Sequence, residues 1–571
     1  MNLNEIIKAA RGEKPADLLI TNARIINVFT GDIVTDSFAV SDGYIIGFGD
    51  YQARKIIDVQ NRFVAPGFID PHLHIESSMA CLTEFARAVL VHGTTSVVAD
   101  PHEIANVLGK DGITYMLQSA EGQPMNFYFT LSSCVPATDM ETSGAIINAA
   151  DLKTMMGNER IVALAEMMNF PGVINGNPEV LAKIEAARQH RKPIDGHAPG
   201  LTGQNLYAYL AAGVRSDHEC TTAHEAQEKL KAGMHIMIRQ ATGARNLKEL
   251  LPVVNDKTAR RVMLCTDDRH PHDLLEDGHI DAIVREAIGL GLDPVMAIQM
   301  VTVNAAEYFR LDHLGAVAPG RQADFMVFAD LSSPIIEQVY YRGFRVAENG
   351  EMRPEIETPQ PIAVKPSMNV KLKKIDFSIP AESKQIRVID IVPDQIVTQQ
   401  GIEDAMLSGG LAVSDPSRDL LKIAVVERHK GTGNVGKAFL RGLGLKRGAL
   451  ASSVAHDSHN IIVVGTTDAD MKTALEAVVE MGGGLAAVLD SIPVATLPLP
   501  IAGLMSLDPV PKIREQMDRL IAVSHELGST LNDPFMTLSF LALPVIPELK
   551  ITDIGLIDVN QFKVVPLFVD A

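Results

Sequence analysis

The feature that most restricts the fold is a series of eight short apolar runs, each followed by a segment long enough for a helix. The runs read FIDPHLH, TTSVVAD, FYFTLSS, IVALAEM, KPIDGH, GVRSDH, MHIMIR and RVMLCTDD. Strands that alternate with helices indicate βαβ units and a parallel sheet. Eight units within roughly 200 residues predict an α/β fold built on a (β/α)8 TIM barrel.

Shorter β-rich sequence flanks this segment on both sides. Between residues 17 and 64, short runs are separated by Gly, Asn and Asp turns, and the β rhythm returns in HLGAVAPGRQADFMVFADL and VYYRGFRVAENG. We expect the two pieces to form one β-sandwich that is discontinuous in sequence. The predicted domains are residues 1–65 (first part of the sandwich), 66–322 (barrel), 323–366 (second part of the sandwich and linker) and 367–571 (C-terminal domain).

The C-terminal residues have a pattern of their own. Strand-like IRVIDIV, LKIAVVE and HNIIVVGTT alternate with helix-like DADMKTALEAVVEM and PKIREQMDRLIAVSHEL. The proline-rich stretch that precedes them, RPEIETPQPIAVKPS, is typical of a linker. This pattern predicts a separate C-terminal α/β domain.

Charge and cysteine content exclude several classes of function. The net charge of −19 argues against a nucleic-acid partner, since such proteins gather Lys and Arg on one face. The four cysteines form no CxxC pair, so we expect neither a disulfide framework nor a cysteine zinc site. With no visible export signal or membrane span, we expect a cytoplasmic protein without a membrane partner. We expect it to act on a small molecule and to form a homo-oligomer, with a dimer favoured.

Residues that can bind metal ions stand where the predicted strands end. His72 and His74 end the first strand and share one of its faces, so both are expected to point into the barrel mouth. The later strand ends carry Glu166, His197, His218 and Asp267. A lone histidine is usually structural, but six such residues at the carboxyl ends of barrel strands predict a metal site.

The number of ions is a separate question. Four histidines and two carboxylates can enclose one ion, or they can hold two ions bridged by a carboxylate. We favour two ions, because Glu166 stands where a bridging group reaches both halves of the set. Mixed nitrogen and oxygen ligands are compatible with zinc, iron or manganese.

Longer motifs resemble a known family. APGFIDPHLH, the strand-end His197, His218 and Asp267, and the closing GAVAPGRQADFMVF are similar to the amidohydrolase superfamily. Within it, HIESSM, VVADPHEIANVLG, AEMMNFPGV and HKGTGNVGKAFLRGLGLKRGALASSVAHDSHNIIVVG resemble the bacterial adenine deaminases. Many binuclear members of the superfamily bridge their ions with a carbamylated lysine on the fourth strand, whereas this sequence has Glu166, as the adenine deaminase branch would.

The resemblance implies hydrolysis of adenine to hypoxanthine and ammonia by a metal-activated hydroxide. It implies two divalent metal ions, manganese or iron, with zinc also compatible. It further implies that Asp267 ligates weakly, takes a proton from the attacking water and passes it to the leaving ammonia. The alternatives are another amidohydrolase acting on a cyclic amide or a different aminated heterocycle, and a metal-bearing binding subunit without catalysis.

A second acid has to protonate or hydrogen-bond N1 of the purine as charge builds there. Asp100 and Glu103, in VVADPHE at the end of the second strand, are the candidates. The alternative is a helix cap, since DPHE has Asp, Pro and Glu at the positions that capping favours. His102, between them, is a candidate substrate contact; the alternative is that it supports a neighbouring residue of the site without touching the substrate.

Two further motifs carry weaker signals. GTGNVG, residues 431–436, matches the dinucleotide fingerprint GxGxxG, but it does not follow its strand directly and lacks the Ser or Thr of a P-loop, so we interpret it as a glycine-rich turn. His456, Asp457 and His459 in VAHDSHN are candidates for a further metal site. We favour the alternative that they cap a loop or contact the barrel mouth from the C-terminal domain.

Overall fold

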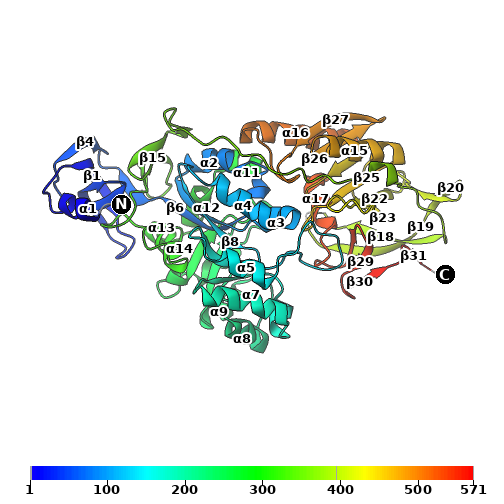
Figure 1. Cartoon of the computed structure of the whole chain (residues 1–571), viewed down its shortest axis with the longest axis horizontal. Helices are drawn as coiled ribbons and strands as arrows, with labels where there is room; N and C mark the ends of the chain where they lie inside the picture. The colour runs from blue at the N-terminus through cyan, green and yellow to red at the C-terminus, as the bar shows by residue number, and fades with distance from the viewer. Residues whose placement is uncertain (1–2, 394, 570–571) are drawn as a thin grey trace.

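The chain is described here by a computed structural model, which covers residues 3–393 and 395–569. The N-terminal strands lie at one end of the long axis, the helices that surround the parallel strands occupy the middle, and the C-terminal sheet lies at the other end (Figure 1). Among the described residues, every helix is too short or too polar to cross a lipid bilayer.

All eight predicted runs of the central segment contain parallel strands. The first five form one sheet in the order β10-β9-β8-β7-β6, and the other three form a second sheet in the order β11-β12-β13. Their bounds are β6 Phe68–Leu73, β7 Thr94–Ala99, β8 Asn126–Leu131, β9 Ile161–Met167, β10 Ile194–Gly196, β11 Ser216–Asp217, β12 His235–Arg239 and β13 Val262–Cys265. Almost every residue of these strands is buried, as parallel strands covered by helices require.

Backbone hydrogen bonds join the two parallel sheets at both ends. On one side, the amide of Asp267 donates to the carbonyl of His72 at 3.1 Å. On the other, the amide of Arg215 donates to the carbonyl of Ile194 at 3.0 Å. The carboxyl ends of all eight strands therefore lie around one common region.

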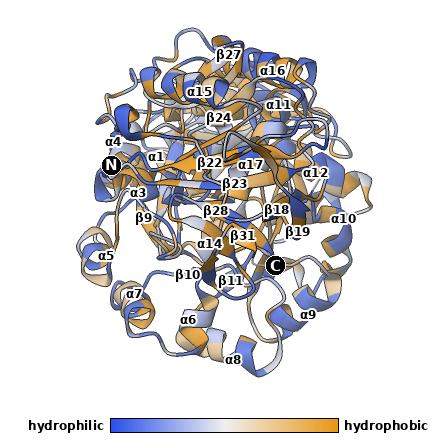
Figure 2. Cartoon of the chain, turned by 90° about the vertical axis from the view of Figure 1, so that its right-hand side faces the viewer, coloured by the Kyte–Doolittle hydropathy of each residue, from blue (hydrophilic) through white to orange (hydrophobic). Residues whose placement is uncertain are grey.

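Helices surround these strands. Their bounds are α2 Leu82–Leu90, α3 His102–Leu108, α4 Lys110–Ser119, α5 Ala149–Met155, α6 Phe170–Ile174, α7 Pro178–Gln189, α8 Gly203–Ala212, α9 Ala223–Lys231, α10 Leu247–Leu250, α11 Pro271–Glu276, α12 Ile280–Gly289, α13 Pro294–Met300 and α14 Val303–Tyr308. Figure 2 shows hydrophilic and hydrophobic residues mixed along α8 and α9, as expected of helices with one face in water.

The two flanking β segments form one sheet. Strand β14 (Phe325–Phe328) pairs antiparallel with β5 (Phe63–Pro66), and β5 pairs with β1 (Ala16–Ile26). The other elements of this unit are α1 Leu3–Ala10, β2 Ile33–Ser41, β3 Tyr44–Phe48, β4 Ala53–Asp58, β15 Ile336–Tyr341, β16 Phe344–Glu348 and β17 Glu351–Met352.

The C-terminal residues contain the predicted strands and helices. The strands form a mixed sheet. Its order is β19-β18-β23-β22-β25-β24-β26-β27, with β31 beside β18, and every pair except β18–β23 is antiparallel. The bounds are β18 Gln385–Ile391, β19 Thr398–Asp404, β22 Leu421–Val426, β23 Val435–Arg441, β24 Ala449–Ser452, β25 Ile461–Gly465, β26 Gly484–Leu489, β27 Ile492–Pro498, β31 Phe568–Val569, α15 Asp468–Glu480, α16 Val510–Glu526 and α17 Pro534–Leu541. Two smaller sheets comprise β20 Met406–Ser408 and β21 Leu411–Val413, and β28 Leu549–Thr552, β29 Gly555–Asp558 and β30 Lys563–Val565.

The GTGNVG stretch lies in the hairpin between β22 and β23. These strands are antiparallel, so the stretch does not lead from a strand into a helix as a dinucleotide-binding or phosphate-binding loop does. The Glu427 carboxylate accepts hydrogen bonds from the backbone amides of Lys430 (2.5 Å) and Thr432 (2.8 Å), which holds the turn closed. The interpretation as a glycine-rich turn is confirmed.

The C-terminal sheet is docked directly on the central strands. Ser506 forms a parallel bridge with Ala80, and its amide donates to the carbonyl of Met79 at 2.7 Å. Met79 and Ala80 belong to the same apolar cluster as the buried side chains of α16 and α17. The segment that follows His74 is therefore shared between the two parts of the protein.

Candidate metal centre

The six residues predicted as metal ligands come together at the carboxyl ends of the parallel strands. His72 and His74 lie at the end of β6, Glu166 lies on β9, and His197, His218 and Asp267 follow β10, β11 and β13. The side chains of five of them are almost fully buried, and that of His197 is 27% exposed. Because each of these strands ends at the same edge, residues up to 195 positions apart share one site.

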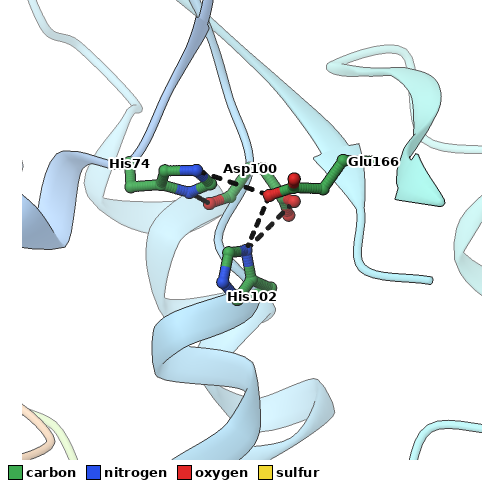
Figure 3. A group of neighbouring side chains, drawn as sticks. All are labelled: His74, Asp100, His102 and Glu166. Carbon is green, nitrogen blue, oxygen red and sulfur yellow. Dashed lines mark hydrogen bonds and ion pairs between the residues drawn. The ribbon is translucent and has the colours of Figure 1, made fainter. Parts of the chain in front are cut away.

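Glu166 lies at the centre of the group. Its Oε1 atom is 3.4 Å from His74 Nε2 and 3.5 Å from His102 Nδ1. Its Oε2 atom is 2.6 Å from His197 Nδ1 and 3.2 Å from His218 Nε2. Figure 3 shows His74 and His102 pointing toward this carboxylate from one side. The two oxygens thus face two different sets of imidazoles, which is the arrangement that a bridging carboxylate requires.

The possible ligand atoms fall into overlapping groups whose members lie within 4.8 Å of one another. The groups are His74, Asp100, His102 and Glu166; Glu166, His197 and His218; His72, His218 and Asp267; and His74, Asp267 and Asp268. Four residues each belong to two of these groups: His74, Glu166, His218 and Asp267. These buried groups are consistent with a metal site, as is typical of barrels with histidines at their strand ends.

The donor set also passes a test that does not depend on counting ligands. Within residues 3–393 and 395–569, the buried Nε2 atom of His72 has no hydrogen-bond partner. Its nearest carboxylate oxygen, Oδ1 of Asp267, is 3.7 Å away. A buried polar atom is normally paired, so an unpaired imidazole nitrogen that faces a carboxylate is the group that a metal ion would satisfy.

Both central carboxylates are ionised. Burial raises the pKa of Glu166, but hydrogen bonds and charge from His197 and His218 outweigh it and hold the pKa well below its usual range. Burial likewise raises the pKa of Asp267, and the hydrogen bond from His74 and the charge of Arg239 reverse the effect. Two ionised carboxylates among neutral or cationic imidazoles suit the binding of divalent cations.

The acidic residues and the histidine of VVADPHE lie in different surroundings in the structure. The Asp100 carboxylate is 3.1 Å from His102 Nδ1 and accepts a hydrogen bond from Ser132 at 3.3 Å. Asp100 does not cap α3, whose N-cap is Pro101 and has no side-chain cap hydrogen bond, so the capping alternative is wrong. His102 lies against the metal-binding groups, with Nδ1 3.5 Å from Glu166.

Glu103 points away from Glu166, into a cavity between the strand ends and the C-terminal residues. Burial raises the pKa of its carboxyl, but the neighbouring imidazoles of His456, His459 and His102 hold the pKa well below its usual range. The cavity is lined on one side by Glu76, Ser77, Met79, Glu103, Asp268 and His270, and on the other by Ser452, Val454, His456, His459, Leu485, Leu504, Met517, Phe535, Met536, Ser539 and Phe540. It is acidic toward the strands and mainly apolar toward the C-terminal domain.

Several residues of the site were not predicted. Arg239, the last residue of β12, donates to Asp267 at 3.1 Å and to Glu219 at 2.9 Å. Both Arg239 and Glu219 stand at strand ends, so the strand-end rule that identified the candidate ligands would have found them. Glu76 lines the cavity; burial raises its pKa to about 7, and its Oε2 atom has no hydrogen-bond partner among the described residues.

A buried lysine holds two of the ligand-bearing loops together. Lys229, on α9, is fully buried and donates to the carbonyl of Ala198 at 2.7 Å and to Asp217 at 2.8 Å. Asp217 also accepts from the amide of Ala198 at 2.8 Å. Ala198 follows His197 and Asp217 precedes His218, so this ion pair fixes the spacing of two imidazoles.

We expect Lys229→Met to lower both stability and metal content. The substitution leaves the Asp217 charge buried without its partner, a change that costs about 3–5 kcal/mol in other proteins. Urea unfolding and metal analysis by mass spectrometry measure the two effects. Lys231→Met, an exposed position on the same helix, is the control and should change neither. Loss of stability with full metal content would show that the ion pair does not fix the ligands.

Comparison with known proteins agrees with this geometry. Residues 63–372 match the model of the amidohydrolase family, and residues 395–563 match that of the adenine deaminase C-terminal domain. The first match covers the central strands and the second covers most of the C-terminal sheet.

Three curated relatives match along almost the whole chain. An adenine deaminase of Desulfatibacillum aliphaticivorans is 55% identical over 99% of this chain and 99% of its own length. One of Methanothrix thermoacetophila is 49% identical over 100% of both chains, and one of Dehalococcoides mccartyi is 48% identical over 99% of both. The chain belongs to the amidohydrolase family, in the group of the adenine deaminases.

Proposed function

We propose that the protein is an adenine deaminase, which hydrolyses adenine to hypoxanthine and ammonia at this site. The observation that carries the proposal is Glu166, whose two oxygens face separate sets of imidazoles at the ends of parallel strands. The relatives that share this chain's length and 48–55% of its residues are named for the same activity.

We assign the metal ligands to the six predicted residues, with Glu166 shared between two ions. His74 faces Oε1 of Glu166, and His197 and His218 face Oε2. His72 and Asp267 lie beside His218 and complete the set. Manganese or iron is the expected metal, and zinc is compatible with the same nitrogen and oxygen donors. When bound, such ions lower the pKa of water to about 7, which would supply the nucleophile at neutral pH.

Asp267 is the group that moves the proton of the attacking water. Arg239 holds its Oδ2 atom at 3.1 Å, so Oδ1 is left facing the imidazoles of His72 and His74. From this position the carboxylate takes one proton from the water and passes it to the leaving amino group. A fixed carboxylate among the ligands contributes both orientation and general base catalysis.

Glu103 rather than Asp100 is the acid at N1 of the purine. Glu103 lines the cavity, whereas Asp100 is not among the residues that line it. N1 of adenine is a hydrogen-bond acceptor, so the ionised Glu103 takes up a proton when the base binds and holds it at N1. Hypoxanthine keeps that proton, and the second proton of the water replaces it.

We also propose the organisation that brings these groups together. The hydrogen bonds at both seams support a closed (β/α)8 barrel for residues 66–322, with a β-sandwich from residues 1–65 and 323–366 and a C-terminal domain from 367 onward. Four buried free cysteines support a cytoplasmic location. Exposed apolar side chains such as Phe344 and Ile335 support a homodimer.

Ammonia release tests the proposed function. Protein purified without iron and loaded with manganese should release ammonia from adenine but not from adenosine or cytosine. Chelation should abolish the activity, and added manganese should restore it, with two ions bound per chain by mass spectrometry. If two ions are bound and adenine is not hydrolysed, the proposed substrate is wrong, and cyclic amides become the next substrates to test.

A further inference from the structure

A loop of the C-terminal domain reaches into the site. Residues 453–460 connect β24 to β25, and two histidines of this loop contact Glu103. His456 Nδ1 is 2.8 Å from Glu103 Oε1, and His459 Nε2 hydrogen-bonds Glu103 Oε2. His459 and Glu103 are both buried although they are 356 residues apart in sequence. The favoured interpretation of VAHDSHN, contact with the barrel mouth, is confirmed.

The hydrogen bonds of His459 determine where its proton lies. The backbone amide of Ala455 donates to His459 Nδ1 at 3.1 Å, so Nδ1 is the accepting nitrogen. In the neutral ring the hydrogen then lies on Nε2, which therefore donates to the Glu103 carboxylate.

This tautomer argues against a further metal ion at Glu103, His456 and His459, although their ligand atoms lie within 4.8 Å of one another. A metal ion on His459 Nε2 would move the ring proton to Nδ1. Two N–H groups, those of Nδ1 and of Ala455, would then point at each other.

The loop around His459 is built to hold this orientation. The fully buried Arg428 donates to the carbonyl of His459, and also to Ser367 Oγ (3.0 Å) and the carbonyl of Ala502 (2.9 Å). His459 itself has φ +53°, a left-handed conformation that is unfavourable for a residue other than glycine. Such a conformation persists only where the surrounding contacts require it.

We propose that His459 is a positioning residue that fixes the Glu103 carboxylate for its work at N1, so that the C-terminal domain completes the active site. The inference rests on the proposed function, in which Glu103 acts on the bound base. Glu103 lies on the short helix α3 at the edge of the cavity, and a carboxylate free to rotate about its side-chain bonds would spend little time in the reactive orientation. The N–H donor of His459 fixes Oε2, and His456 Nδ1 lies 2.8 Å from Oε1, so the carboxylate is held at the edge of the cavity.

Two substitutions of His459 distinguish two roles: orienting the Glu103 carboxylate, and supporting the loop to which His459 belongs. His459→Asn places an amide where the δ atoms of the ring were, so it can still accept from Ala455 and tolerates the left-handed backbone, but it cannot reach Glu103. His459→Gln is longer by one bond and can restore a donor to Glu103. We expect the Asn variant to lose about 10²-fold in kcat, the lower range of general acid–base effects, with KM changed less than about threefold. The Gln variant should recover to within about tenfold of the wild-type kcat.

A double-variant cycle with Glu103→Gln completes the test. If His459 acts through Glu103, adding His459→Asn to Glu103→Gln should lower kcat by less than about threefold further, because coupled residues are not additive. Both metal ions should remain bound in every variant. His525→Asn, at an exposed histidine of the same domain that does not line the cavity, is the control and should keep wild-type kinetics.

Several outcomes would overturn the inference. Additive losses in the cycle, equal losses in the Asn and Gln variants, or loss of metal or of folding in the Asn variant would each assign His459 a structural role. Wild-type kinetics in the Asn variant would assign it none. Failure of the proposed function is distinguishable, because the wild-type enzyme itself would then release no ammonia from adenine.

Discussion

Glu166→Gln is expected to remove the bound metal and to lower the rate of adenine hydrolysis by about 10³–10⁴-fold. Gln has the same shape but no charge and only one acceptor oxygen, so it cannot hold both sets of imidazoles around two cations. The loss corresponds to the several kcal/mol that metal ions contribute to catalysis. Metal analysis of the purified variant and the ammonia assay measure the two effects.

The matched control is Glu159→Gln. Glu159 is exposed and lies just before the same strand, so it undergoes the same loss of charge outside the site. It should bind two ions and react at the wild-type rate. A Glu166→Gln protein that keeps both ions would contradict the bridging role, because the remaining donors would then suffice to bind them.

Glu103→Gln is expected to keep both metal ions and to lose about 10²–10⁴-fold in kcat, the range of general acid–base catalysis. The carboxylate of Glu103 points into the cavity and contacts His456 and His459, away from the oxygens of Glu166 that face the ligands. Gln can still hydrogen-bond the base, so KM should change less than kcat. Steady-state kinetics and metal analysis on the same preparation measure the result.

The two substitutions are informative as a pair. Both remove one negative charge from a buried carboxylate at the end of a strand or the start of a helix. If one carboxylate binds metal and the other moves a proton, metal content should separate them while activity falls in both. Equal metal loss in both variants would show that the division of roles is wrong.

Much of the site was predictable from the sequence because strand ends are recognisable. An apolar run that stops at a polar residue marks the carboxyl end of a parallel strand, and His72, His74 and Glu166 each stand at such a point. The discontinuous β unit was predictable for a similar reason, since β rhythm returned in the segment that forms β14 to β16. The spacing of hydrophobic residues indicates which side chains are buried, and burial of those side chains stabilises the strands and helices.

The sequence was a poorer guide to whether neighbouring strands pair parallel or antiparallel, and to the residue at which a helix begins. The alternation of strands and helices after residue 367 did not reveal that the sheet is almost entirely antiparallel, because pairing direction depends on connections rather than on periodicity. The capping pattern of DPHE was equally misleading. The helix begins one residue later than that pattern requires, and Asp100 bonds to His102 and Ser132 instead.

By itself, the sequence determined the eight strands of the central segment, the candidate metal ligands at their ends and the family to which they are similar. Only the tertiary structure decided which oxygen of Glu166 faces which imidazoles, that Glu103 and not Asp100 lines the cavity, and that His459 reaches Glu103 across 356 residues. The reason is physical. A residue's type and its place on a strand are local properties, whereas a hydrogen bond between distant segments depends on how the whole chain packs, which no local pattern records.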